Sequence, residues 1–234
     1  MNNPINNNPQ STREFLRELK KEGDEYTMKY LVRPLSVLPT LLLVRYTNIT
    51  PNQVSLFAFL LAVIGSIFLF LGGYWYQLIG VLFAYLYVVF DCVDGNIARV
   101  KKLKSLEGRW LDAIGGFIVT PLLLFALLWG MKNPSLFVFG SLAMLAYPMQ
   151  YLIVFFYKSR IIGNNDPLPI AFGGTLEKLR YAYGSALFFP VLAFAVIFQQ
   201  VYFLLWFYAV VGNLVWVFTL GLQYREIKKK NNNS

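Results

Sequence analysis

Two aspartates stand three residues apart where a long apolar run ends. Asp91 and Asp94 follow the run "IGVLFAYLYVVF" and precede Gly95, Ala98 and Arg99. At about 100° per residue on a helix, the two carboxylates share one face, with the small residues between and beside them and Arg99 at its border. This arrangement predicts a site that binds a charged ligand.

A glycine and a third aspartate follow a short basic stretch. Gly108 and Asp112 are four residues apart and so share a face of the next helix. A helical hairpin would bring three carboxylates together. Such oxygen ligands suit Mg²⁺ or Mn²⁺ better than zinc, and a divalent ion commonly also binds substrate phosphates. The small residues would admit a nucleotide diphosphate, and Arg99 would neutralise phosphate charge.

The same residues have a purely structural interpretation. Charged residues at helix ends are often only solvated termini, and small residues four apart can form a packing stripe between membrane helices. Three carboxylates on shared faces, near the depth at which charges become costly in a membrane, favour the metal site.

The elements that carry these residues are predicted to be membrane helices. The chain has 234 residues, of which 57% are hydrophobic and only 14% are charged. About 20 apolar residues cross the ~30 Å hydrocarbon core of a bilayer. Six runs qualify and predict an all-α integral membrane protein with six transmembrane helices: 54–71, 73–90, 110–131, 135–157, 181–198 and 202–222.

The segment before these runs is predicted to lie on the membrane surface. Residues 31–44 are too few to span and contain Arg33, Pro34 and Pro39, which predicts a broken interfacial helix. A capping-box pattern from Ser11 to Glu14 begins a charged surface helix. The expected organisation is a disordered polar start (1–10), surface and interfacial helices (11–48), a six-span catalytic domain (49–225) and a basic tail (226–234).

The positive charge predicts the orientation. Of the 21 lysines and arginines, all except Lys132 fall on one side of the predicted spans, which puts both termini and Asp91 in the cytoplasm. Because this charge clusters around hydrophobic runs, anionic membrane lipids are the expected partner and nucleic acid is not. The chain has no histidine, which excludes His-based triads, and its one cysteine excludes an internal disulfide. We see no cleavable signal peptide in the polar start.

The acidic stretch resembles the signature of the CDP-alcohol phosphotransferases, Asp-x2-Asp-Gly-x2-Ala-Arg-x8-Gly-x3-Asp-x3-Asp. Seven positions match at the required spacing: Asp91, Asp94, Gly95, Ala98, Arg99, Gly108 and Asp112. The segment "ITPNQVS" at 49–55 is also similar to the lead into that family's first span, and the similarity covers roughly residues 30 to 225.

The resemblance implies an integral membrane enzyme of a bacterial or archaeal cell membrane, usually a homodimer. Such enzymes cleave a CDP-linked alcohol or lipid, release CMP and move the phospho-alcohol to a hydroxyl acceptor with Mg²⁺ or Mn²⁺. It implies that the three aspartates bind the metal and take part in catalysis. The nucleotide-binding residues would be Asn52, Ser55, Asp94, Gly95, Ala98, Arg99, Ser105 and Gly108.

One signature position departs from the pattern. Gly116 stands where the resemblance predicts a fourth aspartate, which acts as the general base for the acceptor hydroxyl and as a ligand of a second metal. Three explanations remain open. The acceptor is already anionic, such as a lipid phosphate, and needs no base. Alternatively, the chain binds nucleotide without turnover, or the glycine is an engineered change in an ordinary enzyme.

The binding site for the acceptor is less well defined. Basic residues between the fourth and fifth runs are candidates for an acceptor phosphate: Lys158, Arg160, Lys178 and Arg180. They are equally explained as anchors of the positive-inside type. Two other classes of protein also remain. A channel or transporter would use the aspartates as an ion path, and a non-catalytic scaffold would bind nucleotide without releasing CMP.

Overall fold

The computed structural model describes residues 15, 19, 26–162 and 185–232, and all regular structure among them is helical. The elements relevant to the site are η1 (Met28–Val32), α2 (Arg33–Tyr46), α3 (Pro51–Leu71), α4 (Tyr74–Val100), α5 (Leu106–Gly130) and α6 (Phe137–Phe156). The remainder are η2 (Pro134–Leu136), η3 (Tyr157–Ile162), η5 (Ser185–Leu187), α8 (Phe188–Ile197), α9 (Val201–Phe207), η6 (Tyr208–Gly212) and α10 (Asn213–Asn232).

Five helical segments in the described part of the chain are long and apolar enough to cross a membrane: Pro51–Leu71, Tyr74–Val100, Leu106–Gly130, Pro134–Phe156 and Val201–Lys229. They coincide with five of the six predicted runs. The run at 181–198 is represented by the shorter apolar helix α8, and its first residues lie outside the described ones. The sixth span therefore stays a prediction.

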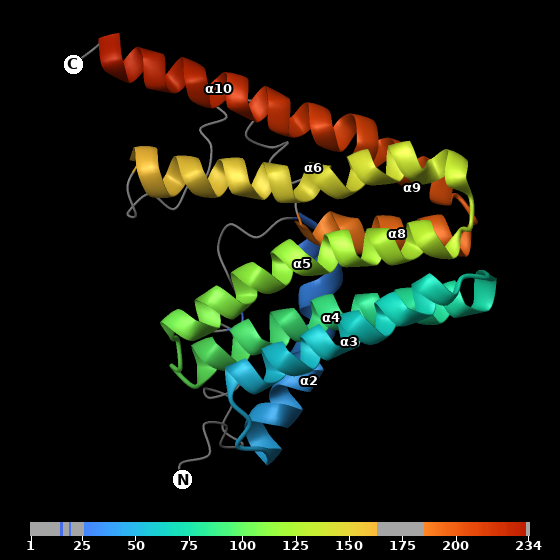
Figure 1. Ribbon diagram of the computed structural model, residues 1–234. Helices are drawn as coiled ribbons and strands as arrows, with labels where there is room; N and C mark the ends of the chain where they lie inside the picture. The colour runs from blue at the N-terminus through green and yellow to red at the C-terminus, as the bar shows by residue number, and fades with distance from the viewer. Residues whose placement is uncertain (1–14, 16–18, 20–25, 163–184, 233–234) are drawn as a thin grey trace.

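The helices alternate in direction, so that their connections fall at two ends (Figure 1). The α4–α5 connection and the C-terminal ends of α6 and α10 lie at one end, and the α3–α4, α5–α6 and α8–α9 connections lie at the other. This alternation agrees with the distribution of basic residues, because Lys132 is in the α5–α6 connection. The main core combines buried side chains of α3, α4, α5, α8 and α9, including Leu69, Val88, Leu124 and Leu192.

Glycines bring α3, α4 and α5 into backbone contact away from the α4–α5 connection. A Cβ atom on Gly65 would lie 2.9 Å from the carbonyl oxygen of Gly80, and one on Gly130 would lie 2.1 Å from the carbonyl oxygen of Leu69. Gly72 ends α3 with a φ of 74° and faces Gly130. The three helices are thus held together where no side chain fits between them.

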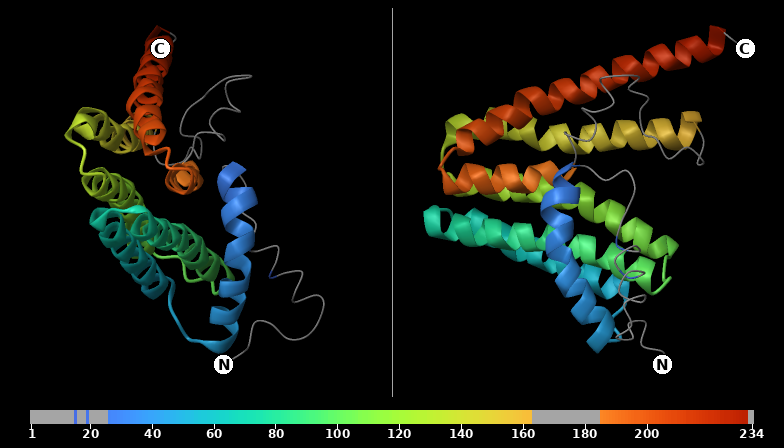
Figure 2. Two further views of the ribbon diagram at one scale, coloured as in Figure 1. Left: turned by 90° about the vertical axis from the view of Figure 1, so that its right-hand side faces the viewer. Right: turned by 180° about the vertical axis from the view of Figure 1, so that it is seen from behind.

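Helix α2 crosses the direction of α3–α5 (Figure 2) and packs against α4. The expectation of a broken helix is wrong, because α2 continues through Pro39. Pro39 has no N–H to donate to the carbonyl of Leu35, and Leu35 is an exposed residue. A stripe four residues apart is buried: Val32, Ser36, Thr40 and Val44.

The surface helix predicted from Ser11 lies almost entirely outside the described residues. Two of its residues are described, Phe15 and Leu19, and both are buried in a second apolar cluster with Val44, Val54 and Ile97. The predicted disordered start at 1–10 also lies outside the described residues. At the other terminus α10 carries most of the predicted basic tail, since the helix extends to Asn232.

Candidate active site

The first half of the signature lies inside a helix. Helix α4 continues past the apolar run to Val100, so Asp91, Asp94 and Arg99 occupy its last turns rather than a loop. The helix then closes with two backbone hydrogen bonds, from Lys102 N to Arg99 O (3.1 Å) and from Leu103 N to Ala98 O (2.9 Å). This is a Schellman ending with Lys102 in the left-handed region, at φ 56°. It turns the chain directly into α5.

The second half of the signature begins at a helix cap. Ser105 is the N-cap of α5, and its hydroxyl accepts a hydrogen bond of 3.0 Å from the backbone N–H of Gly108. The serine therefore has a structural task besides its predicted place beside the nucleotide. The cap fixes the direction in which Gly108 and Asp112 leave the turn.

The start of α3 completes the site. Thr50 and Gln53 form a capping box with Pro51 in the first turn, which fixes the position of Asn52 and Ser55. The Ser55 hydroxyl donates a hydrogen bond of 2.5 Å to Oδ2 of Asp94, whose side chain is only 7% exposed. A Cβ on Gly108 would lie 3.1 Å from Oδ1 of Asn52, so the glycine lets α5 begin close to α3.

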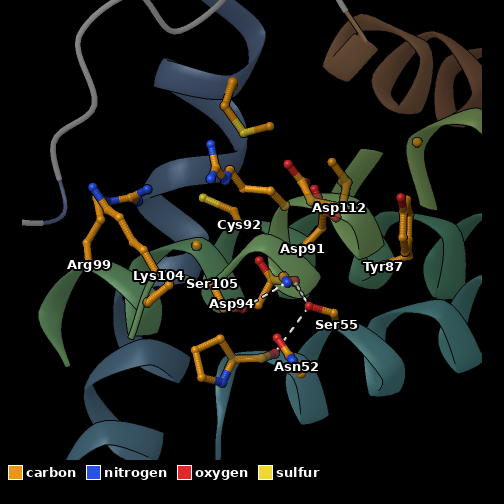
Figure 3. Close-up of a pocket in the computed structure, with 18 of the residues that line it drawn as sticks. Asn52, Ser55, Tyr87, Asp91, Cys92, Asp94, Arg99, Lys104, Ser105 and Asp112 are labelled. Atoms are coloured by element: carbon orange, nitrogen blue, oxygen red, sulfur yellow. Dashed lines mark hydrogen bonds between the residues drawn. The ribbon is translucent and has the colours of Figure 1, made fainter. Parts of the chain in front are cut away.

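A cavity of about 920 Å³ lies between these three helix ends. All seven matched signature positions line it, together with Asn52, Ser55, Ser105 and Gly116. Figure 3 shows Arg99 and Lys104 on one side and Tyr87 on the other, with the carboxylates of Asp91, Asp94 and Asp112 between them. The structure thus brings every residue of the predicted nucleotide and metal sites to one cavity.

Gly116 faces this cavity beside aromatic side chains. A Cβ at residue 116 would lie 3.8 Å from the hydroxyl oxygen of Tyr147, which belongs to α6. Tyr87 and Tyr151 line the same cavity. Where the resemblance predicts a carboxylate, this chain has a glycine, and a Cβ there would make only an ordinary van der Waals contact with a phenol hydroxyl.

The chemistry of the carboxylates fits a hard divalent cation, because all three aspartates offer oxygen atoms to one cavity. Asp94 and Asp112 are also close enough for their charges to interact. Within the described part of the chain, however, no three His, Cys, Asp or Glu side chains are near enough to surround one ion. A cation held by all three aspartates would therefore require their side chains to converge further.

The structure gives little information on the four residues predicted to bind an acceptor phosphate. Arg160 is exposed in η3, which follows α6, and does not line the cavity. Lys178 and Arg180 lie outside the described residues, and the side chain of Lys158 is not described. The assignment of these four residues stays a prediction.

Several cavity residues were missed by reasoning from the sequence. Arg33 of α2 and the tyrosines Tyr87, Tyr147 and Tyr151 all line the cavity. The sequence did contain one indication that Arg33 has a special role, because it is a cation among the apolar residues 31–44. The tyrosines carry no such signal, because an aromatic residue in a membrane helix is ordinarily a packing or interface residue.

Comparison with known families agrees with the signature. The profile of the CDP-alcohol phosphatidyltransferases matches residues 48–221, from just before α3 into α10. The chain belongs to this family. No curated protein matches the chain significantly. The family match includes the helix ends that form the cavity but begins after α2, so Arg33 lies outside it.

Proposed function

We propose that this CDP-alcohol phosphatidyltransferase family member is a metal-dependent membrane enzyme that transfers a phospho-alcohol from a CDP-linked alcohol to an acceptor and releases CMP. One observation carries the proposal: all seven signature residues that match line a single cavity with Asn52 and Ser55. A packing stripe has no need for a cavity of this size, which falls within the range of small-molecule sites.

The nucleotide would bind between the starts of α3 and α5 and the end of α4. A diphosphate can approach the helix backbone at Gly95, Ala98 and Gly108, because these cavity residues have no side chain or only a methyl group. Arg99 would hold a phosphate oxygen through its planar guanidinium group. Ser55 orients Asp94 by its hydrogen bond and so prepares the carboxylate for a ligand.

Asp91, Asp94 and Asp112 would hold Mg²⁺ or Mn²⁺. When bound, such an ion neutralises charge on the diphosphate and on the departing phosphate. In the transfer, an acceptor oxygen bonds to the phosphorus that carries the alcohol, and the bond from this phosphorus to the oxygen of CMP breaks. The electron pair of that bond leaves with CMP. The protein supplies alignment of the two oxygens and a cavity of positive and hydrogen-bonding groups.

The environment of Gly116 favours an anionic acceptor as the second part of the proposal. Such an acceptor, for example a lipid phosphate, attacks without first losing a proton and needs no base. Gly116 lies beside the hydroxyl group of Tyr147, and a carboxylate at residue 116, which would repel an incoming anion, is absent from this chain. If the acceptor is instead a hydroxyl, the chain lacks its base and turns over slowly.

The enzyme would act at the cytoplasmic face of a bacterial or archaeal membrane. The support is the basic charge at the ends of the helices that carry the cavity, together with large apolar side chains exposed on the spans, such as Leu56, Phe70 and Phe155. Reporter fusions after Tyr157 and at the C-terminus should both report cytoplasm. The homodimer implied by the family resemblance can be measured by light scattering in detergent.

The function is tested by CMP release from CDP-linked alcohols in proteoliposomes. We expect release that needs Mg²⁺ or Mn²⁺, stops with EDTA and depends on an added acceptor, with lipid phosphates and alcohols compared in parallel. CDP binding without CMP release would instead identify a non-catalytic nucleotide-binding protein. Ion flux without nucleotide binding would identify a channel.

A further inference from the structure

One residue inside the signature stretch lies behind the cavity rather than on it. Asn96 follows Gly95 at a position where the signature pattern accepts any residue, and its side chain is fully buried. Its neighbours Gly95, Ala98 and Arg99 line the cavity, whereas the Asn96 side chain is directed toward α2. Burying an amide is costly unless its hydrogen bonds are satisfied, so its partners indicate its role.

The orientation of the Asn96 amide is fixed by α2. Its nitrogen donates to the hydroxyls of Ser36 (3.0 Å) and Thr40 (3.1 Å), both of which are fully buried. Those hydroxyls donate in turn to the carbonyls of Arg33 and Ser36, so they accept from Asn96 rather than donate to it. The nitrogen and oxygen of the amide therefore cannot exchange places, and the oxygen faces away from these hydroxyls as an acceptor.

The amide oxygen accepts hydrogen bonds from two arginines that line the cavity. Nη2 of Arg99 donates to Oδ1 of Asn96 at 2.5 Å, and Nη1 of Arg33 donates to the same atom at 3.3 Å. A free arginine side chain has many rotamers, and a bond to an acceptor that is itself fixed limits them. This restriction on Arg99 holds whatever other groups its guanidinium group contacts.

A second asparagine in the structure joins helices without contacting the cavity. Asn213, at the start of α10, donates to the carbonyls of Leu142 in α6 (2.9 Å) and of Ala209 (2.8 Å), and it accepts from the indole of Trp216 (2.8 Å). None of these residues lines the cavity. Asn96 and Asn213 both join two helices, but of the two only Asn96 contacts a residue of the proposed nucleotide site.

We propose that Asn96 is a positioning residue that holds the guanidinium group of Arg99 where it meets a phosphate of the nucleotide. The proposal deepens the proposed function and rests on it for the identity of the ligand. Because Ser36 and Thr40 orient the amide, the packing of α2 against α4 sets the geometry of the nucleotide site. The family match begins at residue 48, so α2 acts on the site from outside the matched region.

The test is a double-mutant cycle on CDP affinity, measured by calorimetry on the full-length protein in detergent. We expect Asn96→Ala to weaken CDP binding by about 10-fold or more, the usual effect of losing a hydrogen bond to a charged group. In an Arg99→Ala background the same substitution should weaken binding by less than about 2-fold further, because the group that Asn96 holds is already gone. A role confined to helix packing would lower the affinity by the same factor in both backgrounds.

Two further variants separate positioning from stability. Asn213→Ala is the matched control, since it removes an asparagine that joins two helices away from the cavity, and it should lower the melting temperature but leave CDP affinity unchanged. Because Asn96→Ala removes a fully buried amide, Asn96→Ser is measured with it. The serine hydroxyl keeps a polar group beside Ser36 and Thr40 but lies nearer the backbone and no longer reaches Arg99, so we expect the same coupling with Arg99→Ala.

Equal factors in the two backgrounds overturn the positioning role, and so does a loss of CDP affinity in Asn213→Ala as large as that in the Asn96 variants. Failure of both Asn96 variants to fold also overturns it, because Asn96 would then be required for folding itself. If the original protein binds CDP and the factors are equal, only the positioning role is refuted. If the original protein does not bind CDP, the proposed function is refuted and the positioning role with it.

Discussion

Apart from Gly108, which allows close packing at the cavity end, the glycines at the two ends of the α3–α4–α5 group serve opposite purposes. At the end near the α3–α4 connection, a Cβ on Gly130 would meet backbone at 2.1 Å, and one on Gly72 would meet backbone at 2.3 Å. At the cavity end, a Cβ on Gly95 would meet only the Arg99 side chain at 3.4 Å, and one on Gly116 only Tyr147 at 3.8 Å. The first group closes the helices together, and the second keeps space open beside the carboxylates.

This contrast distinguishes the two interpretations of small residues in membrane helices. A packing glycine is recognised by another backbone within van der Waals reach, and substitution there disturbs the fold. A glycine that serves a site has empty space or a movable side chain before it, and substitution there disturbs the ligand. Substitution of a packing glycine should therefore lower stability, and substitution of a glycine beside the cavity should weaken ligand binding.

The largest expected effect is at Gly116, where a Cβ would make only an ordinary van der Waals contact with Tyr147. If the acceptor is a hydroxyl and the base is missing, Gly116→Asp should raise turnover by about 10²–10⁴-fold. If the acceptor is anionic, the new carboxylate repels it and turnover should fall. Gly116→Asn, which has nearly the same volume and no charge, is the control. Equal rates for all three proteins would mean that residue 116 does not face the reacting groups.

Removal of a cavity carboxylate should have the next largest effect. Loss of a residue that only hydrogen-bonds to a metal ligand costs ~10–100-fold in activity. Because the aspartates are proposed to bind the metal directly, CMP release should fall by more than this in Asp91→Ala, Asp94→Ala and Asp112→Ala. Metal and CDP affinity should fall together in calorimetry. Glu107→Ala is the control, because Glu107 is exposed in the first turn of α5 and does not line the cavity. Unchanged CDP affinity in all three aspartate variants would remove the basis for the metal assignment.

The smallest expected effect is on stability at the glycine-packed end. Gly130→Ala forces a methyl group against the Leu69 carbonyl, and overpacking of this kind costs about 1–3 kcal/mol. Gly221→Ala in α10 meets no atom within 4 Å and should gain up to about 1 kcal/mol from helix propensity. Unfolding in denaturing detergent measures both. A Gly130→Ala protein as stable as the original would contradict the backbone contact.

The sequence was sufficient to predict the helical membrane class, five of the spans and the position of the signature residues around one cavity. These features depend on the length of each apolar run and on the spacing of residues along a single helix, and both can be read from the sequence. It did not predict that α2 continues through Pro39 or that Arg33 reaches Asn96, because a contact 63 residues apart depends on how two helices cross. The tyrosines beside Gly116 were missed for the same reason, since Tyr147 comes from α6.

The central claim is that the cavity at the end of α4 binds the nucleotide, and CDP affinity of Gly95→Leu tests it most directly. Gly95 lines the cavity and a Cβ there meets only a movable side chain, so leucine should fill the site without unfolding the protein. Gly221→Leu places the same side chain on another helix in open space and should bind CDP like the original protein. The account predicts loss of CDP binding in Gly95→Leu alone, at an unchanged melting temperature. A Gly95→Leu protein that is folded and binds CDP normally would contradict it.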